Sequence, residues 1–246
     1  NNMHTQALTT AHLADATVVE RDPRGIKVLR LPNGHYLKVF RLRHRYGWAR
    51  LHGYAQRFCK HAQKLQARKI PTVRVLQCLR VEDETLLHYP LGEKPLHAKT
   101  TSTAPGFRHT YVVAYAPLEG ETLKHLLEQA RLTDKHVAQL GAFIAQLHAS
   151  GIYFRSLHLG NIVLTPDAQM GLIDIADMDI YRWPLWFSTR LRSFRHLTRY
   201  AALNHQFGQH NWQQLLDHYI QHASLNRLEV LWLRSKMRHF LLHPPH

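Results

Sequence analysis

One segment of the chain, residues 153–176, constrains the fold more than any other. It reads YFRSLHLGNIVL, then a turn at Thr165-Pro166-Asp167, then GLIDIA after a short spacer. The pattern predicts a polar loop after an apolar helix, followed by two short strands over 162–164 and 171–174. Because Asn161 and Asp174 would present hard oxygen ligands on adjacent strands, the segment predicts a site for a divalent cation.

The rest of the chain changes character near residue 116. The part before it has period-two alternation around Pro32-Asn33-Gly34, which predicts a hairpin. Apolar spacings of three and four predict a helix over 48–69 with Leu51, Tyr54, Phe58, Ala62 and Leu65 facing inward. The predicted strands of this part cover 16–20, 26–31, 35–40, 73–81, 85–88 and 110–115, and residues 89–109 read as a loop. The later part predicts helices over 123–130, from Thr133 to near Gly151, and from Leu185 onward.

These elements, in this order, resemble the protein-kinase-like fold. The loop FRSLHLGN (154–161) stands where such kinases carry H-R-D-L-x-x-x-N, and DIA (174–176) stands where they carry D-F-G. Within that fold, the strings YFRSLHLGNIVL and LIDIAD are similar to bacterial lipopolysaccharide core kinases, especially a toluene-tolerance or lipopolysaccharide-kinase-like branch. The resemblance implies an α+β, two-lobed fold with a strand-rich N-lobe over 1–115 and a helical C-lobe over 116–246.

The resemblance also implies roles for single residues. Lys38 matches the lysine that contacts nucleotide phosphates, and Tyr115 ends the hinge strand on the nucleotide side. Asn161 and Asp174 match the metal ligands, so ATP and Mg²⁺ are the implied cofactors.

Three further residues of the loop are candidates for the chemistry itself. Ser156 occupies the position of the substrate-facing Asp. Three roles are open for His158: a general base, since the ordinary pKa of histidine lies near 6.5, a neighbour of the metal, or a structural residue that bonds the loop backbone. Arg155 is a candidate for neutralising charge on the transferring phosphoryl group.

The charge of the chain predicts an anionic partner. Lys and Arg number 32 against 17 Asp and Glu, a net charge of +15. Residues 23–81 contain no carboxylate but 15 Lys or Arg. A second basic cluster, interleaved with aromatic residues, comprises Arg182, Arg190, Arg192, Arg195 and Arg199. Such patches attract an anionic glycolipid such as the lipopolysaccharide core, an anionic membrane surface, or nucleic acid.

Three functions therefore remain as hypotheses. The first is an ATP- and Mg²⁺-dependent phosphotransferase acting on a sugar of the lipopolysaccharide core. The second is a pseudokinase that serves as a scaffold in envelope assembly, favoured by Ser156 and by the lack of a helix carboxylate to pair with Lys38. The third is a non-specific nucleic-acid binder, although the sequence contains no helix-turn-helix, zinc-finger or ribonucleoprotein signature.

Several other classes do not fit. Cys59 and Cys78 are the only cysteines, too few for a disulfide framework or a thiolate zinc site. The histidines lack H-E-x-x-H spacing. No apolar run reaches the roughly 20 residues that a spanning helix needs, and the first residues show no secretory-signal pattern. We expect a cytoplasmic protein with peripheral contact at the inner face of the cytoplasmic membrane.

Overall fold

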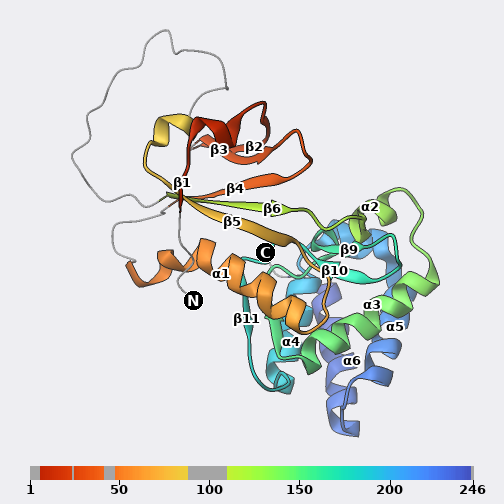
Figure 1. Ribbon diagram of the computed structural model, residues 1–246. Helices are drawn as coiled ribbons and strands as arrows, with labels where there is room; N and C mark the ends of the chain where they lie inside the picture. Colours follow the sequence, from red (N-terminus) through yellow and green to blue (C-terminus); the bar gives the residue numbers. More distant parts are fainter. Residues whose placement is uncertain (1–5, 24, 42–47, 88–109, 245–246) are drawn as a thin grey trace. The chain divides into compact units, whose positions relative to one another are not determined.

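The computed structural model describes residues 6–23, 25–41, 48–87 and 110–244, and for residues 48–53 and 84 the backbone alone (Figure 1). The described chain forms two compact units. Unit 1 comprises Asn1–Ala62 and Val73–Pro117, and unit 2 comprises Gln63–Thr72 and Leu118–His246. The predicted loop over 89–109 lies outside the described residues.

Unit 1 is built on a six-stranded sheet in the order β1-β5-β6-β4-β3-β2. Its strands are β1 (Gln6–Ala7), β2 (Thr17–Asp22), β3 (Gly25–Arg30), β4 (Tyr36–Phe40), β5 (Arg74–Val81) and β6 (Thr110–Ala116). Strand β1 pairs parallel with β5, and the other neighbours pair antiparallel. Strands β3 and β4 form the predicted hairpin, and the 3₁₀ helix η1 (Thr10–Leu13) precedes β2.

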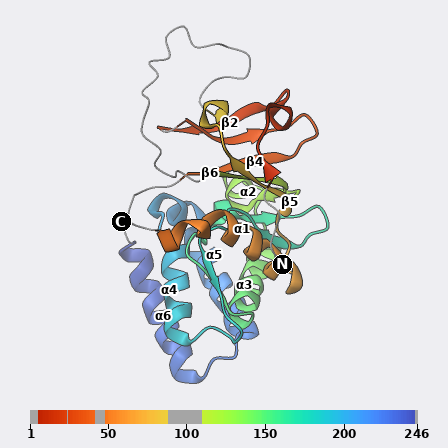
Figure 2. The same ribbon diagram turned by 60° about the vertical axis from the view of Figure 1, so that its left-hand side comes forward.

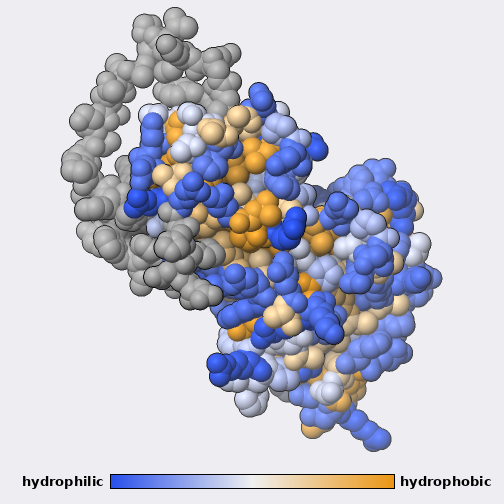
Figure 3. Space-filling view, viewed as in Figure 1, coloured by the Kyte–Doolittle hydropathy of each residue, from blue (hydrophilic) through white to orange (hydrophobic). Residues whose placement is uncertain are grey.

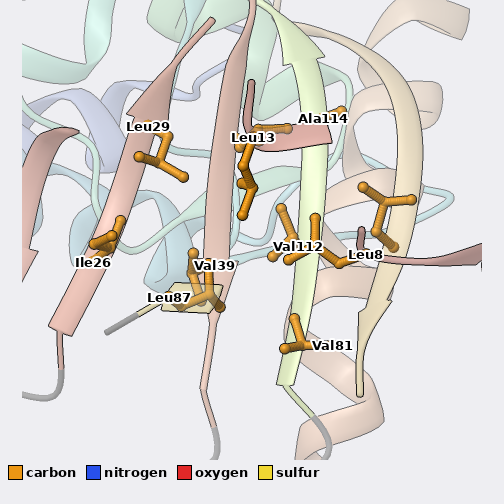
Figure 4. Packing of buried hydrophobic residues seen from close by; sticks show 11 residues of the cluster. Leu8, Leu13, Ile26, Leu29, Val39, Val81, Leu87, Val112 and Ala114 are labelled. Carbon is orange, nitrogen blue, oxygen red and sulfur yellow. The ribbon is translucent and has the colours of Figure 1, made fainter. Parts of the chain in front are cut away.

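Alternation along β4 divides the sheet into two faces. Leu37 and Val39 are buried in an apolar cluster that also receives Ile26, Leu79 and Val112 (Figure 4). Because side chains alternate across a strand, Tyr36, Lys38 and Phe40 point to the opposite face.

Helix α1 (Trp48–Ala67) covers that opposite face with Phe58, whose ring lies 5.7 Å from Phe40 and 5.6 Å from Tyr115 between centroids. The inward positions of the helix are partly as predicted, since Phe58, Ala62 and Leu65 are buried. Tyr54 is wrong: its side chain is exposed, and the neighbouring Ala55 is buried. The side chain of Leu51 lies outside the described residues.

The strand predicted over 85–88 is also wrong for residues 85–87, whereas His88 lies outside the described residues. Residues Glu84–Leu87 form the 3₁₀ helix η2. Asp83 Oδ1 accepts hydrogen bonds from the backbone nitrogen of Thr85 at 2.9 Å and from its hydroxyl at 2.5 Å. This local capping turns the chain into a helix and delivers Leu87 to the apolar cluster.

Unit 2 is mostly helical (Figure 2). Its helices are α2 (Leu123–Glu128), α3 (Asp134–Ala149), α4 (Phe187–Leu197), α5 (Ala201–His222) and α6 (Arg227–Leu242). Its strands are β7 (Glu121–Thr122), β8 (Ile152–Phe154), β9 (Ile162–Leu164), β10 (Met170–Leu172) and β11 (Met178–Ile180). Helices α3 and α5 pack closely at Gly141, where an added Cβ would lie 2.5 Å from the carbonyl oxygen of Leu215.

Together the two units confirm the predicted fold class. The described structure is α+β, with a strand-rich N-terminal part and a helical C-terminal part, as expected for a kinase-like fold.

Candidate functional site

In unit 1, Lys38 and Tyr115 lie on the sheet face that α1 covers. Lys38 Nζ lies 5.8 Å from the ring centroid of Phe58 and 5.9 Å from that of Phe40. Tyr115 stacks on Tyr36 with centroids 5.8 Å apart and also contacts Phe58. The register places Lys38 opposite Val113. An aromatic surface thus surrounds the lysine, and cation–π attraction helps to hold its ammonium group.

In unit 2, the loop that follows β8 is held by its own backbone and by Asn161. This residue ends the short 3₁₀ helix η3 (Leu159–Asn161), and its Nδ2 donates to the carbonyl oxygen of Ser156 at 2.8 Å. Because the amide nitrogen is committed to this bond, the side-chain oxygen Oδ1 is the remaining ligand atom of Asn161. Asn161 is buried, so its orientation is fixed by packing as well.

His158 bonds the loop backbone. Its Nδ1 accepts a hydrogen bond from the backbone nitrogen of Gly160 at 3.0 Å, which caps η3. The proton of the neutral ring therefore resides on Nε2. Burial, and then the charge of Arg199, lower the pKa of His158, while Asp174 opposes this effect. This geometry matches the backbone-bonding alternative for His158, because the Nδ1 lone pair is already occupied.

Asp174 lies where the chain leaves β10. The backbone nitrogen of Ile173 donates to the carbonyl oxygen of Asn161 at 3.0 Å, which brings the two predicted metal ligands to neighbouring positions. Asp174 has a φ of 53°, in the left-handed region, and its side chain is exposed. Aspartate tolerates this conformation better than most residues, and such strain clusters at functional sites.

Close packing against Pro71 explains why strand β10, which precedes Asp174, has a glycine at position 171. Strand β10 runs against Pro71, whose carbonyl oxygen accepts from the backbone nitrogen of Leu172 at 2.9 Å. An added Cβ on Gly171 would lie 2.5 Å from that same oxygen. The hydroxyl of Thr72 donates a hydrogen bond to the carbonyl oxygen of Leu172 at 2.7 Å. Hydrogen bonds to Pro71 and Thr72 therefore both hold this strand in place.

Arg155 binds two carboxylates of its own unit. Its Nε donates to Asp177 Oδ1 at 2.9 Å and its Nη1 to Asp179 Oδ2 at 2.6 Å. The backbone nitrogen of Arg155 also donates to the carbonyl oxygen of Asp177 at 3.1 Å. The guanidinium therefore ties the loop to strand β11, which pairs with β8.

A network that the sequence analysis missed supports the same loop. Arg199 Nη2 donates to the carbonyl oxygen of Arg155 at 2.8 Å and lies 2.7 Å from His196 Nδ1. His196 Nε2 lies 2.8 Å from the hydroxyl of Tyr153. Burial and the charges of Arg199 and Arg155 lower the pKa of His196 to about 4, so the ring is neutral near pH 7. In the sequence, only the Arg-rich pattern after Tyr181 indicated that helix α4 and the residues just after it do more than fill the core.

The basic cluster over 182–199 does not form one face. Arg182, Arg192 and Arg195 are exposed, whereas Arg190 is buried and its Nε donates to the carbonyl oxygen of Leu185 at 2.8 Å. Arg190 therefore packs inside unit 2.

A comparison with protein families identifies the chain at this point. A family model described as Lipopolysaccharide kinase (Kdo/WaaP) family matches residues 26–219. The chain belongs to this family. The predicted resemblance to lipopolysaccharide core kinases is thereby confirmed, and membership supports a kinase acting on lipopolysaccharide. A comparison with curated proteins finds no match.

The family match runs from β3 into α5, and so includes every candidate site residue of this lipopolysaccharide kinase family member. Helix α6 follows the matched region. The part of the chain that the structure describes contains no cluster of three or more His, Cys, Asp or Glu that could hold a metal ion.

Within the described residues, no helix combines the length and the apolar character that crossing a membrane requires.

Proposed function

We propose that the protein transfers the γ-phosphoryl group of ATP, with Mg²⁺, to a hydroxyl group of a lipopolysaccharide core sugar. The observation that carries this proposal is the family match over residues 26–219, which includes Asn161 and Asp174 at adjoining strand ends. An anionic glycolipid acceptor agrees with the net charge of +15.

The residues present fit a Mg²⁺ ion. Magnesium takes one or two protein carboxylates, keeps several waters and binds substrate phosphates, so it does not need a dedicated cluster of protein ligands. Asp174 offers an exposed carboxylate, and Asn161 offers an amide oxygen whose orientation is set by its bond to Ser156. The bound ion would neutralise charge on the phosphate oxygens.

In unit 1, we assign the nucleotide contacts to Lys38 and Tyr115. The Lys38 ammonium is held near two aromatic rings and would attract phosphate oxygens. Tyr115, the last residue but one of strand β6, lies on the same face of the sheet. No Asp or Glu of residues 23–81 is available to pair with Lys38, because that stretch contains none.

In the proposed step, the acceptor hydroxyl oxygen forms a bond to the γ-phosphorus, and ADP leaves with the electron pair of the broken P–O bond. The hydroxyl proton passes to water, because Ser156 is not a base at neutral pH and the Nδ1 of His158 is occupied. A general base contributes typically about 10²–10⁴-fold. We therefore expect a slow reaction, because no general base is available. The reaction should still proceed, because phosphoryl transfer relies mainly on positioning and charge neutralisation.

The test uses the full chain, γ-labelled ATP, Mg²⁺ and soluble core oligosaccharide released from its lipid. We expect label on the oligosaccharide with the native protein and with Asp134→Asn, which changes an exposed aspartate of α3. Asp174→Asn is expected to abolish the label. Failure of the native protein to label any core oligosaccharide would contradict the proposal.

A second candidate, a pseudokinase scaffold, is favoured by the loop chemistry. Ser156 replaces a carboxylate, and Arg155 is paired with Asp177 and Asp179. This candidate predicts Mg²⁺-dependent ATP binding, or none, without transfer to any core acceptor in the same assay.

A further inference from the structure

Helix α6 carries an apolar stripe that faces away from the rest of unit 2. Leu228, Leu231, Trp232 and Leu242 are 71%, 64%, 61% and 75% exposed. Leu231, Trp232 and Leu242 follow Leu228 by three, four and fourteen residues, which places all four along one face of the helix together with the exposed Ser235 and His239. The opposite face buries Leu233 and Met237. Over 14 residues the stripe is about 21 Å long.

In the space-filling view, hydrophilic side chains predominate over the face of the helical unit that is drawn, and apolar side chains reach the surface among them (Figure 3). A surface hollow of about 270 Å³ is lined by Trp232, Ser235 and Lys236. Large apolar side chains grouped in this way mark an interaction surface.

Basic residues flank the stripe on both sides. On a helical projection Lys236 lies on one side, and Arg227 and Arg238 lie on the other. All three are exposed, and no ion pair joins them to a carboxylate within the described part of the chain. Arg234, by contrast, forms an ion pair with Asp217, with 2.7 Å between Nη2 and Oδ1. The single acid of the helix, Glu229, accepts from the backbone nitrogen of Asn226 at 2.9 Å and caps the first turn.

We propose that this face of α6 docks on an anionic lipid bilayer surface. Leucine and tryptophan on one face, with Lys and Arg beside them, are the composition of a helix that lies in the membrane interface. Each basic residue near an anionic surface adds attraction, and the apolar side chains enter the boundary with the acyl chains. A second copy of this chain is a poor occupant, because both surfaces would carry the same positive charge.

The proposal deepens the proposed function and rests on it for one point, the reason for docking: a kinase that acts on a glycolipid must reach a membrane-embedded acceptor. The docking itself needs no catalysis. The two claims can therefore fail separately.

The experiment measures binding of the full chain to vesicles of phosphatidylethanolamine and phosphatidylglycerol, and to vesicles of phosphatidylcholine alone. The bound fraction is read by sedimentation. The variant Leu228→Gln/Leu231→Gln/Trp232→Gln removes three of the four apolar side chains of the stripe without changing charge. Leu76→Gln is the matched control, because Leu76 is an exposed leucine on β5 of unit 1. Trp232→Phe keeps an aromatic apolar side chain.

We expect the triple variant to lower partition onto the anionic vesicles by at least about tenfold, since three apolar side chains no longer enter the interface. Leu76→Gln and Trp232→Phe should bind as the native chain does. Arg227→Gln/Lys236→Gln/Arg238→Gln should lose at least about tenfold on the anionic vesicles, because each base contributes electrostatic attraction. Thermal unfolding of each variant confirms that these exposed substitutions leave the fold intact.

Undiminished binding of the triple variant, or equal binding of the native chain to phosphatidylcholine, would overturn the proposal. So would an α6-dependent dimer, or an α6-dependent complex with an acidic protein, that forms without vesicle binding. Transfer to soluble core oligosaccharide reports the proposed function independently. Vesicle binding that depends on α6 in a chain without transfer would retain the docking surface and reject the kinase activity.

Discussion

The side-chain Nδ2 of Asn161 donates a hydrogen bond to the carbonyl oxygen of Ser156 over 2.8 Å. The bond spans the turn between the position of the missing carboxylate and the first candidate metal ligand. It closes the loop on itself and leaves Oδ1 as the ligand atom. One amide thus serves both the conformation of the loop and the proposed metal site.

Asn161→Ala should therefore have two effects. The free energy of unfolding should fall by about 1–2 kcal/mol, because a partly buried hydrogen bond is lost. The affinity for ATP in the presence of Mg²⁺ should fall as well, because one oxygen ligand is removed. Urea unfolding and an ATP titration with and without Mg²⁺ measure the two effects.

Asn211 provides a matched control. Its Nδ2 donates to the carbonyl oxygen of Phe207 at 2.7 Å in α5. Asn211→Ala should lower stability to a similar degree and leave ATP affinity unchanged. If Asn161→Ala affected stability alone, as the control does, Asn161 would have no part in the metal site.

Arg155→Gln should destabilise unit 2 by about 1 kcal/mol, because Asp177 and Asp179, two positions apart on the same side of the chain at β11, would lose their shared cation and repel each other. The pair is partly exposed, so the loss should shrink at high salt. Asp177→Asn/Asp179→Asn in the Arg155→Gln background should restore most of the lost stability. Urea midpoints at low and high salt measure these differences.

Arg131 is the comparison for Arg155, because it binds Glu121 with two hydrogen bonds of 2.8 Å at an exposed site. Arg131→Gln should lower the free energy of unfolding by less than Arg155→Gln does. Equal losses at both sites would mean that the Arg155 cluster is an ordinary surface ion pair.

Acid should destabilise the protein through His148. This ring is completely buried, its Nδ1 lies 2.8 Å from the hydroxyl of Tyr219, and burial together with the charge of Arg190 lowers its pKa to about 3. An unfolded histidine binds a proton below about pH 6.5. The unfolded state therefore takes up the proton first, and stability falls as the pH drops from about 6.5 to 3, by up to about 5 kcal/mol.

His148→Gln removes this titration and should flatten the decrease in the free energy of unfolding over that range. His210→Gln changes an exposed histidine of α5 and should keep the native pH profile. Identical profiles for the native chain and His148→Gln would show that the acid sensitivity arises elsewhere.

Local patterns made most of unit 1 predictable. The alternation in β3 and β4 around Pro32-Asn33-Gly34 specifies a hairpin because each strand has one buried face. The segment 85–88 was misjudged because its apolar residues look alike in a short strand and in a 3₁₀ turn, and the cap from Asp83 decided the outcome. Strands β8 and β11 have three residues each, too few for a period to show.

The neighbouring positions of Asn161 and Asp174 were predictable, because their segment has a recognisable order of loop and strands. Their role as metal ligands stays a prediction. The contact of Arg199 with Arg155 was not predictable, since the two residues lie 44 positions apart and only the fold brings them together. The bond between His158 and Gly160 was one of the alternatives that the sequence left open.

The most direct test of the central claim is the thermal stability of the protein with ATP and Mg²⁺, with ATP alone, and in the Asp174→Ala variant. A ligand that binds only the native state at about 100 Kd stabilises it by roughly 2.7 kcal/mol. The account predicts a Mg²⁺-dependent rise in Tm for the native chain that Asp174→Ala abolishes. A native chain whose Tm does not change at millimolar ATP and Mg²⁺, or a rise that persists in Asp174→Ala, would contradict it.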